Sequence, residues 1–213
     1  MKLYHGSKLK IEKPIFAGSK IDNDYGAAFY LTSDLESAHE WACRNNGVGI
    51  VNVYELDLKG LKVLDLTDKS QYSVLNWLAI LLHFRTLEPN FVNAFKARIN
   101  FLEEKYFIDV SQYDVVIGFR ADDAYFRFPL DFVRGNLTIE QLHYSFNLGK
   151  LGIQYVLTSE KAIAKLKFIE VTPSDERYIN KYFENVLFAT ERFDSLNKDE
   201  DGTRIIDIMR DKK

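Results

Sequence analysis

The spacing of apolar residues changes repeatedly along the chain and predicts a mixture of strands and helices. Alternating or continuous apolar runs of strand length predict strands over residues 2–5, 27–31, 50–58, 62–66, 114–119, 154–157 and 168–171. Apolar residues spaced three and four apart predict helices over residues 33–47, 70–85, 89–104, 138–149, 160–166 and 174–193. Because strands and helices are mixed without strict alternation, the pattern favours an α+β fold over a doubly wound parallel sheet.

Polar residues at two of the expected helix starts support this interpretation. Ser33 is followed three residues later by Glu36, and Thr138 is followed at the same distance by Gln141. This spacing is typical of a capping box, in which the two side chains bond free backbone N–H groups of the first turn. The sequence therefore predicts helices that begin beside Ser33 and Thr138.

The length of the chain fits one domain with a helical extension. A chain of 213 residues has the size of a single ordinary domain. We expect residues 1–173 to form this domain and residues 174–213 to form a C-terminal helix and a charged tail packed on it. Ser174 is expected to cap the helix, and the tail beyond Ser195 is expected to be mobile. The apolar stripe of this helix is predicted to be Ile179, Phe183 and Leu187.

Composition narrows the class of protein. Hydrophobic residues make up 46% of the chain, which is typical of a folded globular domain. Twenty-eight basic against 31 acidic residues give a net charge of −3, which excludes a dominant basic surface for nucleic acid but not a local basic groove. The sequence shows neither a signal peptide nor an apolar run long enough to span a bilayer. We therefore expect a cytoplasmic protein without membrane contact.

The cysteine and the histidines show no metal-binding pattern. Cys43 is the single cysteine and lies within a predicted helix, where a small buried residue is expected. The four histidines lie far apart in the sequence without the spacing of a zinc site, so no metal is expected. Among them, His39 is expected on the solvent side of its helix.

Three short segments carry residues suited to binding or catalysis. In the first, His5-Gly6-Ser7, a glycine at a strand end lets a ligand approach the main chain, unless the strand simply runs into a turn. In the second, Tyr30 ends a strand and Trp41 follows eleven residues later in a helix. The two rings either clamp a flat heteroaromatic group or are ordinary core aromatics. In the third, Gln154 is the polar residue at the start of a late strand. It either belongs to the site or is a strand-edge glutamine that faces water.

Together and in this order, these segments resemble the ADP-ribosyltransferase superfamily. The resemblance is to its diphtheria-toxin and poly-ADP-ribose-polymerase branch, whose triad is His-Tyr-Glu. The chain also resembles uncharacterised bacterial domains with Tyr-His-Gly-Ser, Gly-x-Phe-Tyr-Leu-Thr and Ala-Asp-Asp segments. The resemblance spans residues 3–170. It implies a split β-sheet core with surrounding helices, which would bind NAD as co-substrate in a cleft between the two halves of the sheet.

The resemblance implies a role for each matching residue. His5 would bond a hydroxyl of the adenosine ribose, and Ser7 would lie beside the same ribose. Gly6 would offer its backbone N–H and C=O to the nicotinamide carboxamide. Tyr30 and Trp41 would sandwich the nicotinamide ring, although the family usually has tyrosine as the second stacking residue.

The sequence departs from the family at the third position of the triad, where Gln154 stands in place of glutamate. A carboxylate bonded to the ribose 2′-hydroxyl stabilises the positive charge that develops on the sugar as nicotinamide leaves. An amide keeps the hydrogen bond but loses the charge, and the loss of one such group typically lowers the rate by about 10²–10³. Gln154 therefore argues against chain elongation and fast NAD hydrolysis, but not against a single transfer to a good nucleophile.

Other polar residues would complete the site. Asp122 and Asp123 follow a predicted buried strand, and they either complement the start of a helix or face the cleft. In the cleft, one of them would activate the acceptor or supply the missing negative charge. Arg120 would hold a pyrophosphate oxygen, and residues 24–26 would border the cofactor groove. The catalytic candidates are His5, Tyr30, Gln154, Asp122 and Asp123.

The resemblance implies an NAD-dependent mono-ADP-ribosyltransferase that modifies an intracellular macromolecule, either a protein or a nucleic acid. By analogy it would be a bacterial toxin or a phage-defence effector held by an antitoxin protein. The alternative is a catalytically impaired NAD-binding or protein-interaction module on the same fold, which Gln154 favours. A plain RNA-binding domain is a third hypothesis, and the net charge of −3 argues against it.

Overall fold

The computed structural model describes residues 1–44, 47–121, 125–145, 152–196 and 201–211, and their fold is α+β. In these ranges, seven strands form one open mixed sheet in the order β4-β5-β6-β2-β1-β3-β7. The strands are β1 (Lys2–Ser7), β2 (Phe29–Thr32), β3 (Ile50–Leu56), β4 (Val63–Asp65), β5 (Val115–Phe119), β6 (Ile153–Leu157) and β7 (Leu166–Pro173). Of the pairs that they form, β4 with β5 is parallel and the others are antiparallel.

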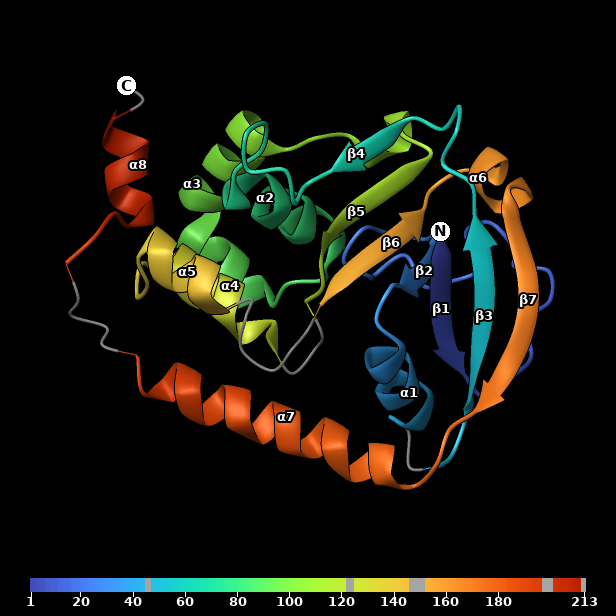
Figure 1. Cartoon of the computed structure of the whole chain (residues 1–213). Coiled ribbons are helices and arrows are strands. Elements are labelled where there is room, and N and C mark those ends of the chain that lie inside the picture. The colour runs from blue at the N-terminus through green and yellow to red at the C-terminus, as the bar shows by residue number, and fades with distance from the viewer. Residues whose placement is uncertain (45–46, 122–124, 146–151, 197–200, 212–213) are drawn as a thin grey trace.

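Helices cover the sheet unevenly (Figure 1). In the described ranges they are α1 (Leu35–Cys43), α2 (Val74–Phe84), α3 (Pro89–Tyr106), α4 (Arg127–Arg134), α5 (Ile139–Ser145), α6 (Glu160–Ala164), α7 (Arg177–Asp194) and α8 (Ile205–Asp211), with a 3₁₀ turn at Val110–Gln112. Figure 1 shows α2 to α5 gathered beside β4, β5 and β6, while α1 lies near β1. The long helix α7 runs along the molecule from the end of β7, past α1, toward α4.

The predicted mixture of strands and helices is confirmed. Each of the seven predicted strands and six predicted helices has a counterpart in the structure, whereas α4 and α8 were not predicted. The helix α2 is buried on nearly every side, which explains why its sequence is apolar almost throughout. None of the helices in the described ranges is both long enough and apolar enough to cross a membrane.

The capping predictions are confirmed for one helix and shifted by one residue for another. The N–H of Thr138 bonds Gln141 Oε1 at 3.0 Å, and the N–H of Gln141 bonds Thr138 Oγ1 at 3.2 Å, as a capping box requires. At α1, however, the cap is Asp34 and not Ser33. The carboxylate of Asp34 accepts from two N–H groups of the first turn and also complements the positive end of the helix dipole, which a serine hydroxyl cannot do.

The predicted start and apolar stripe of the C-terminal helix are both wrong. The helix α7 begins at Arg177, whereas the hydroxyl of Ser174 lies 2.8 Å from His39 Nδ1. Phe183 and Leu187 of the predicted stripe are 52% and 60% exposed. The buried face of the helix is made by Tyr178, Ala189 and Phe193. Apolar residues lie on both faces of this helix, so their spacing gives the period correctly but not the face that packs on α1 and α4.

His39 is buried, which contradicts its expected place on the solvent side of α1. Its ring stacks on that of Tyr178 with 4.6 Å between the centroids, because α7 covers this face of α1. His39 is 6% exposed, and burial lowers the pKa of its imidazole. Cys43, on the same helix, is fully buried as predicted.

The chain beyond Ser195 contains a further packed helix, so the expected mobile tail is wrong for residues 205–211. Ile205 is fully buried and Ile208 is 9% exposed, and both belong to the main hydrophobic core. The N–H of Ile139 also bonds the carbonyl of Thr203 at 2.9 Å, which ties this segment to α5. The charged residues that suggested mobility therefore flank an apolar pair that anchors the end of the chain.

The sheet is weakly joined at its centre, between β1 and β2. The register of these two strands is a single pair, Tyr4 with Thr32, whereas β1 pairs with β3 along six residues. Beyond Tyr4 a side chain replaces the ladder, because Nδ1 of His5 lies 2.7 Å from the carbonyl oxygen of Tyr30. The sheet thus consists of a β4-β5-β6-β2 part and a β1-β3-β7 part that meet at this junction.

Candidate functional site

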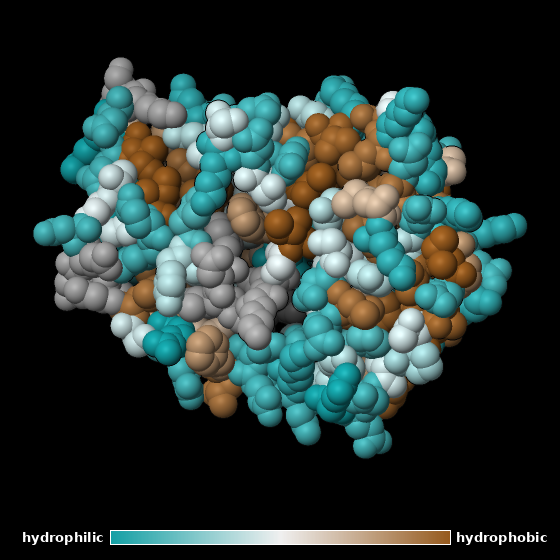
Figure 2. Space-filling model, viewed as in Figure 1, coloured by the Kyte–Doolittle hydropathy of each residue, from teal (hydrophilic) through white to brown (hydrophobic). Residues whose placement is uncertain are grey.

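A cavity of about 590 Å³ lies at the junction of β1 and β2. Its volume falls within the range of small-molecule sites. Figure 2 shows the face hollowed near its centre, in the region where β6 and α1 approach each other in Figure 1. The lining includes six of the residues predicted for the site, namely His5, Gly6, Tyr30, Trp41, Arg120 and Gln154. Residues from distant parts of the sequence therefore meet in one place.

His5 is held as a neutral imidazole with a defined proton position. A carbonyl oxygen only accepts hydrogen bonds, so Nδ1 of His5 must donate its proton to the carbonyl of Tyr30, 2.7 Å away. Burial lowers the pKa of His5, which favours the neutral ring. The ring also stacks on Phe29 with centroids 4.7 Å apart. Nε2 is consequently the acceptor nitrogen, and it suits a hydroxyl donor of a ligand.

Gly6 allows the helix α1 to lie directly against β1. A Cβ atom at this position would stand 2.1 Å from the carbonyl oxygen of Ala38 and 2.6 Å from the nitrogen of Ala42. Both are main-chain atoms, so they cannot move aside as a flexible side chain would. The glycine thus brings the helix that carries Trp41 to the edge of the cavity, whether or not its own backbone contacts a ligand.

Ser7 does not line the cavity. Its hydroxyl donates to the carbonyl of Leu9 and accepts from the side-chain amide of Asn52 at 3.1 Å. The same amide also donates to the carbonyl of Leu9 at 3.0 Å. In the structure, Ser7 therefore holds the turn after β1.

Tyr30 forms a wall of the cavity whose orientation is fixed. Its hydroxyl donates to the carbonyl of Gly26 at 2.6 Å and accepts from the N–H of Tyr25 at 3.2 Å. Burial raises the pKa of the Tyr30 phenol well above its usual value, so the hydroxyl stays protonated. Gly26 has a φ of +78°, in the left-handed region that glycine readily adopts. The ring is thereby clamped between β2 and the preceding loop.

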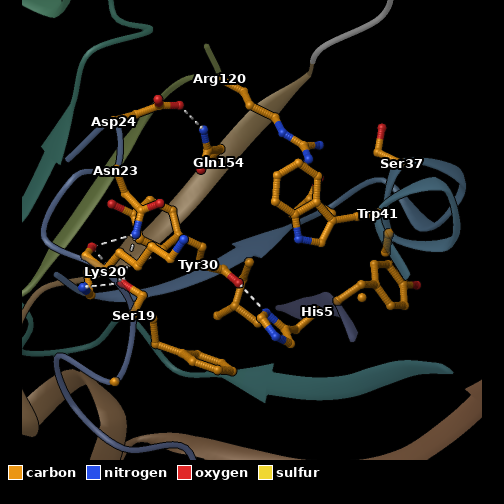
Figure 3. Close-up of a pocket in the computed structure, with 18 of the residues that line it drawn as sticks. His5, Ser19, Lys20, Asn23, Asp24, Tyr30, Ser37, Trp41, Arg120 and Gln154 are labelled. Atoms are coloured by element: carbon orange, nitrogen blue, oxygen red, sulfur yellow. Dashed lines mark hydrogen bonds between the residues drawn. The ribbon is translucent and has the colours of Figure 1, made fainter. Parts of the chain in front are cut away.

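Trp41 lines the cavity and carries arginines on its ring. The guanidinium carbon of Arg120 lies 3.8 Å from the ring centroid, and that of Arg44 lies 4.5 Å from it. Figure 3 shows Arg120 laid against the indole, on the side of the cavity away from Asn23 and Asp24. Cation–π contacts of this kind hold guanidinium groups in place. A flat ligand that stacks on Trp41 must therefore share the ring with an arginine or displace one.

Among the described residues that line the cavity, basic side chains outnumber acidic ones. The basic residues are Lys13, Lys20, Arg44, Arg85 and Arg120. The acidic residues are Asp22 and Asp24. On a chain of net charge −3 this is a local reversal of sign, and it favours an anionic ligand.

Gln154 is a central residue of the site and not an edge glutamine. The strand β6 lies between β2 and β5, and Gln154 is 8% exposed. Its amide nitrogen donates to Oδ2 of Asp24 at 2.9 Å, and the N–H of Ala121 donates to the same oxygen at 2.8 Å. The alternative in which Gln154 faces water is thus excluded.

Asp24 is the polar residue that the sequence did not identify as a site residue. The sequence placed residues 24–26 at the border of the groove, but no local motif marks the carboxylate or its pairing with Gln154, 130 residues away. Burial raises the pKa of Asp24 to about 6, against the opposing effects of the Ala121 N–H, Arg85 and Gln154. A buried carboxylate with a shifted pKa in a cavity is a common feature of functional sites.

The acids Asp122 and Asp123 lie outside the described residues, so the structure does not place either of them. Their described neighbours Arg120 and Ala121 both line the cavity. Among the described residues, no cluster of three or more His, Cys, Asp or Glu side chains has the proximity that a metal ion needs.

Comparison with known proteins gives one family match. A family model described as a protein of unknown function (DUF3990) matches residues 1–168. The comparisons with curated proteins and with solved structures found no match. The matched range contains all the residues that line the cavity, whereas α7 and α8 lie beyond it.

Proposed function

The chain belongs to the DUF3990 family, and we propose that it is an NAD-dependent mono-ADP-ribosyltransferase that uses this cavity. The observation that carries the proposal is that His5, Tyr30 and Gln154, from three distant segments, line one cavity. These are the positions at which the sequence resembles the His-Tyr-Glu branch. The junction of β1 and β2, where the cavity opens, supports the finer proposal of a split-sheet ADP-ribosyltransferase fold.

The groups that line the cavity fit NAD. NAD carries two anionic phosphates, a flat pyridinium ring and ribose hydroxyls. Arg44 and Arg120 offer cationic groups for the phosphates, and Tyr30 offers a fixed ring for stacking. Nε2 of His5 offers an acceptor for a ribose hydroxyl.

The proposed reaction moves ADP-ribose from nicotinamide to an acceptor. The bond between ribose C1′ and the nicotinamide nitrogen breaks, and its electron pair stays on that nitrogen and neutralises the pyridinium charge. A nucleophile of the acceptor forms the new bond to C1′ and loses its proton to water. Gln154 accepts a hydrogen bond from the ribose beside this centre, and Tyr30 keeps the leaving ring in line by stacking.

The resemblance also supports the nature of the acceptor and the biological role. The acceptor is a macromolecule, a protein or a nucleic acid, and the role is that of a bacterial toxin or phage-defence effector with an antitoxin partner.

One observation favours a second function, a module that binds NAD without transfer. It is that Gln154 has an amide where the His-Tyr-Glu branch has a carboxylate. Release of nicotinamide on addition of NAD distinguishes the two.

Calorimetric titration with NAD tests the proposal. We expect the wild-type protein to bind NAD and the folded Tyr30→Ala variant to lose that binding, because the stacking ring is gone. The matched control is Tyr144→Ala, a tyrosine on α5 that is 48% exposed and does not line the cavity. Incubation with labelled NAD and cell lysate then reveals the acceptor. A folded wild-type protein that does not bind NAD would refute the proposed function.

A further inference from the structure

Asp24 and Gln154 form a buried pair inside the cavity (Figure 3). They are 6% and 8% exposed, and the amide nitrogen of Gln154 lies 2.9 Å from Oδ2 of Asp24. The N–H of Ala121 holds the same oxygen at 2.8 Å. The side chain of Gln154 on β6 and the main chain of Ala121 after β5 therefore fix the carboxylate. Removal of the carboxylate would leave these two buried donors without an acceptor.

The pair determines which end of the Gln154 amide is available to a ligand. An ionised carboxylate only accepts hydrogen bonds, so the donating amide nitrogen must face Asp24. The amide oxygen then lies on the opposite side of the group, and Figure 3 shows it turned away from Asp24. In this orientation Gln154 presents an acceptor to a hydroxyl in the cavity, as a glutamate at the same position would.

We propose that Asp24 is the positioning carboxylate of this site, which holds Oε1 of Gln154 toward a ribose hydroxyl and supplies the negative charge that the amide lacks. This inference rests on the proposed function and deepens it. Two side chains thus share the hydrogen bond and the charge that one glutamate combines. During the reaction Asp24 stays ionised and exchanges no atom with the substrate. The electron pair of the bond between ribose C1′ and the nicotinamide nitrogen leaves with nicotinamide.

The charge of Asp24 can act through the intervening amide. Coulomb attraction falls only as the inverse of distance, and it is stronger in a cavity that excludes water. Among the described residues, the charged and titratable groups that interact electrostatically with Asp24 are Arg85, Arg120, Tyr25 and Tyr30. Arg85, 3.6 Å from Oδ1, and Arg120 keep their charge at all ordinary pH values. Burial raises the pKa of both tyrosines, which therefore stay neutral.

Ionisation of Asp24 should consequently be visible in the pH profile of the reaction. Burial raises the pKa of this carboxyl to about 6, so the negative charge is present above this value and lost below it. Protonation removes the negative charge, although Oδ2 can still accept from the amide of Gln154 when the proton is on Oδ1. Nicotinamide release should therefore fall as the pH drops through about 6.

The test compares nicotinamide release and NAD affinity for the wild-type protein, Asp24→Asn, Gln154→Glu and the double variant. Asp24→Asn keeps the shape and an acceptor oxygen but removes the charge, so release should fall about 10²–10³-fold. Gln154→Glu places two carboxylates side by side, which share one proton and give no gain at pH 7. The double variant moves the single charge to position 154, so it should recover release to within about tenfold of wild type or better.

A matched control separates the charge of Asp24 from that of a carboxylate outside the cavity. Asp109→Asn removes a carboxylate that accepts from the N–H of Ser111 at 3.0 Å and does not line the cavity. It should keep the fall in release near pH 6, whereas Asp24→Asn should lose it. Circular dichroism of each variant verifies folding, and the wild-type pH profile tests the proposal without any substitution.

The outcomes distinguish this inference from the proposed function. Wild-type protein that binds NAD but never releases nicotinamide would refute the transferase, and this inference with it. If wild-type release is measurable, equal release by Asp24→Asn would overturn the role of Asp24 alone. A flat wild-type profile between about pH 5 and 7 would do the same.

Discussion

Nδ1 of His5 lies 2.7 Å from the main-chain oxygen of Tyr30, and this hydrogen bond spans the point where β1 and β2 separate. One side chain thus has two effects. It joins the two parts of the sheet, and it leaves Nε2 as an acceptor. The bond also couples the position of the imidazole to the strand that carries Tyr30, so the site and the sheet junction depend on each other.

The first prediction concerns His5→Ala. Loss of one hydrogen bond of about 1 kcal/mol to a ribose hydroxyl should weaken NAD binding roughly fivefold. Calorimetry measures the affinity, and nicotinamide release should fall with it. His83→Ala is the control, because His83 lies on α2 with a side chain 48% exposed and outside the cavity. Equal affinities for the two variants would show that His5 does not contact NAD.

The second prediction separates the ring of Tyr30 from its hydroxyl. Tyr30→Phe keeps the stacking face but loses the bonds to Gly26 and Tyr25, so it should lower the free energy of unfolding by about 1–3 kcal/mol. Its NAD affinity should stay close to that of wild type. Tyr30→Ala should lose the affinity as well. Denaturant titration and calorimetry measure the two quantities, and an affinity loss as large in Tyr30→Phe as in Tyr30→Ala would contradict stacking.

The third prediction uses the two tryptophans. Trp77 is 1% exposed, whereas Trp41 is 37% exposed, so acrylamide should quench the fluorescence of Trp41 almost alone. Saturating NAD should protect Trp41 and lower the quenching constant toward that of a Trp41→Phe variant. The reason is that the ligand covers an indole on which, in the described part of the chain, the guanidinium groups of Arg44 and Arg120 lie. Unchanged quenching in protein shown to be saturated with NAD would remove Trp41 from the site.

The strands and the meeting of the site residues were predictable because local signals encode them. Alternation of apolar residues marks each strand, and His5, Tyr30 and Gln154 each lie within a strand. Once the three strands belong to one sheet, their side chains can line a common cavity. The order of the segments thus carried more information than any single motif.

The partners that the sequence missed are tertiary contacts without a local signal. Asp24 meets Gln154 across 130 residues, and only the neighbouring positions of β2, β5 and β6 bring them together. The burial of His39 depends in the same way on α7, whose packing face was predicted wrongly. In contrast, α4 had a readable local pattern, because Phe128 and Phe132 are four residues apart and Gly135 ends the helix with a φ of +84°.

The fourth prediction concerns the close approach of α1 to β1. Gly6→Ala would place a Cβ atom 2.1 Å from the carbonyl oxygen of Ala38, so the helix must shift. The variant should lose about 3 kcal/mol or more of stability, because the opposing atoms belong to the backbone. Gly47→Ala is the control, since the one atom of the described residues that its Cβ would approach is the flexible end of Lys8, at 3.3 Å. Equal stabilities in denaturant titration would contradict the tight packing.

The last prediction concerns Asp24 and the pH dependence of stability. Burial raises the pKa of this carboxyl from 3.8 to about 6, so the folded protein binds a proton more tightly than the unfolded chain does. The stabilisation from this proton is complete below about pH 4 and is lost as the pH rises through 6. One pKa unit corresponds to about 1.4 kcal/mol, so ionisation of Asp24 lowers the free energy of unfolding by up to a few kcal/mol.

Asp24→Asn removes this ionisation, and its stability relative to wild type should therefore improve steadily between pH 4 and pH 7. Denaturant titrations of both proteins at several pH values measure the difference. Asp114→Asn should show the opposite trend, because hydrogen bonds from Lys62 and Ser159 lower the pKa of that carboxyl to about 2. Its contribution is present above about pH 4 and lost in acid. A constant difference between wild type and Asp24→Asn would mean that Asp24 titrates normally and that its burial in the cavity does not persist in solution.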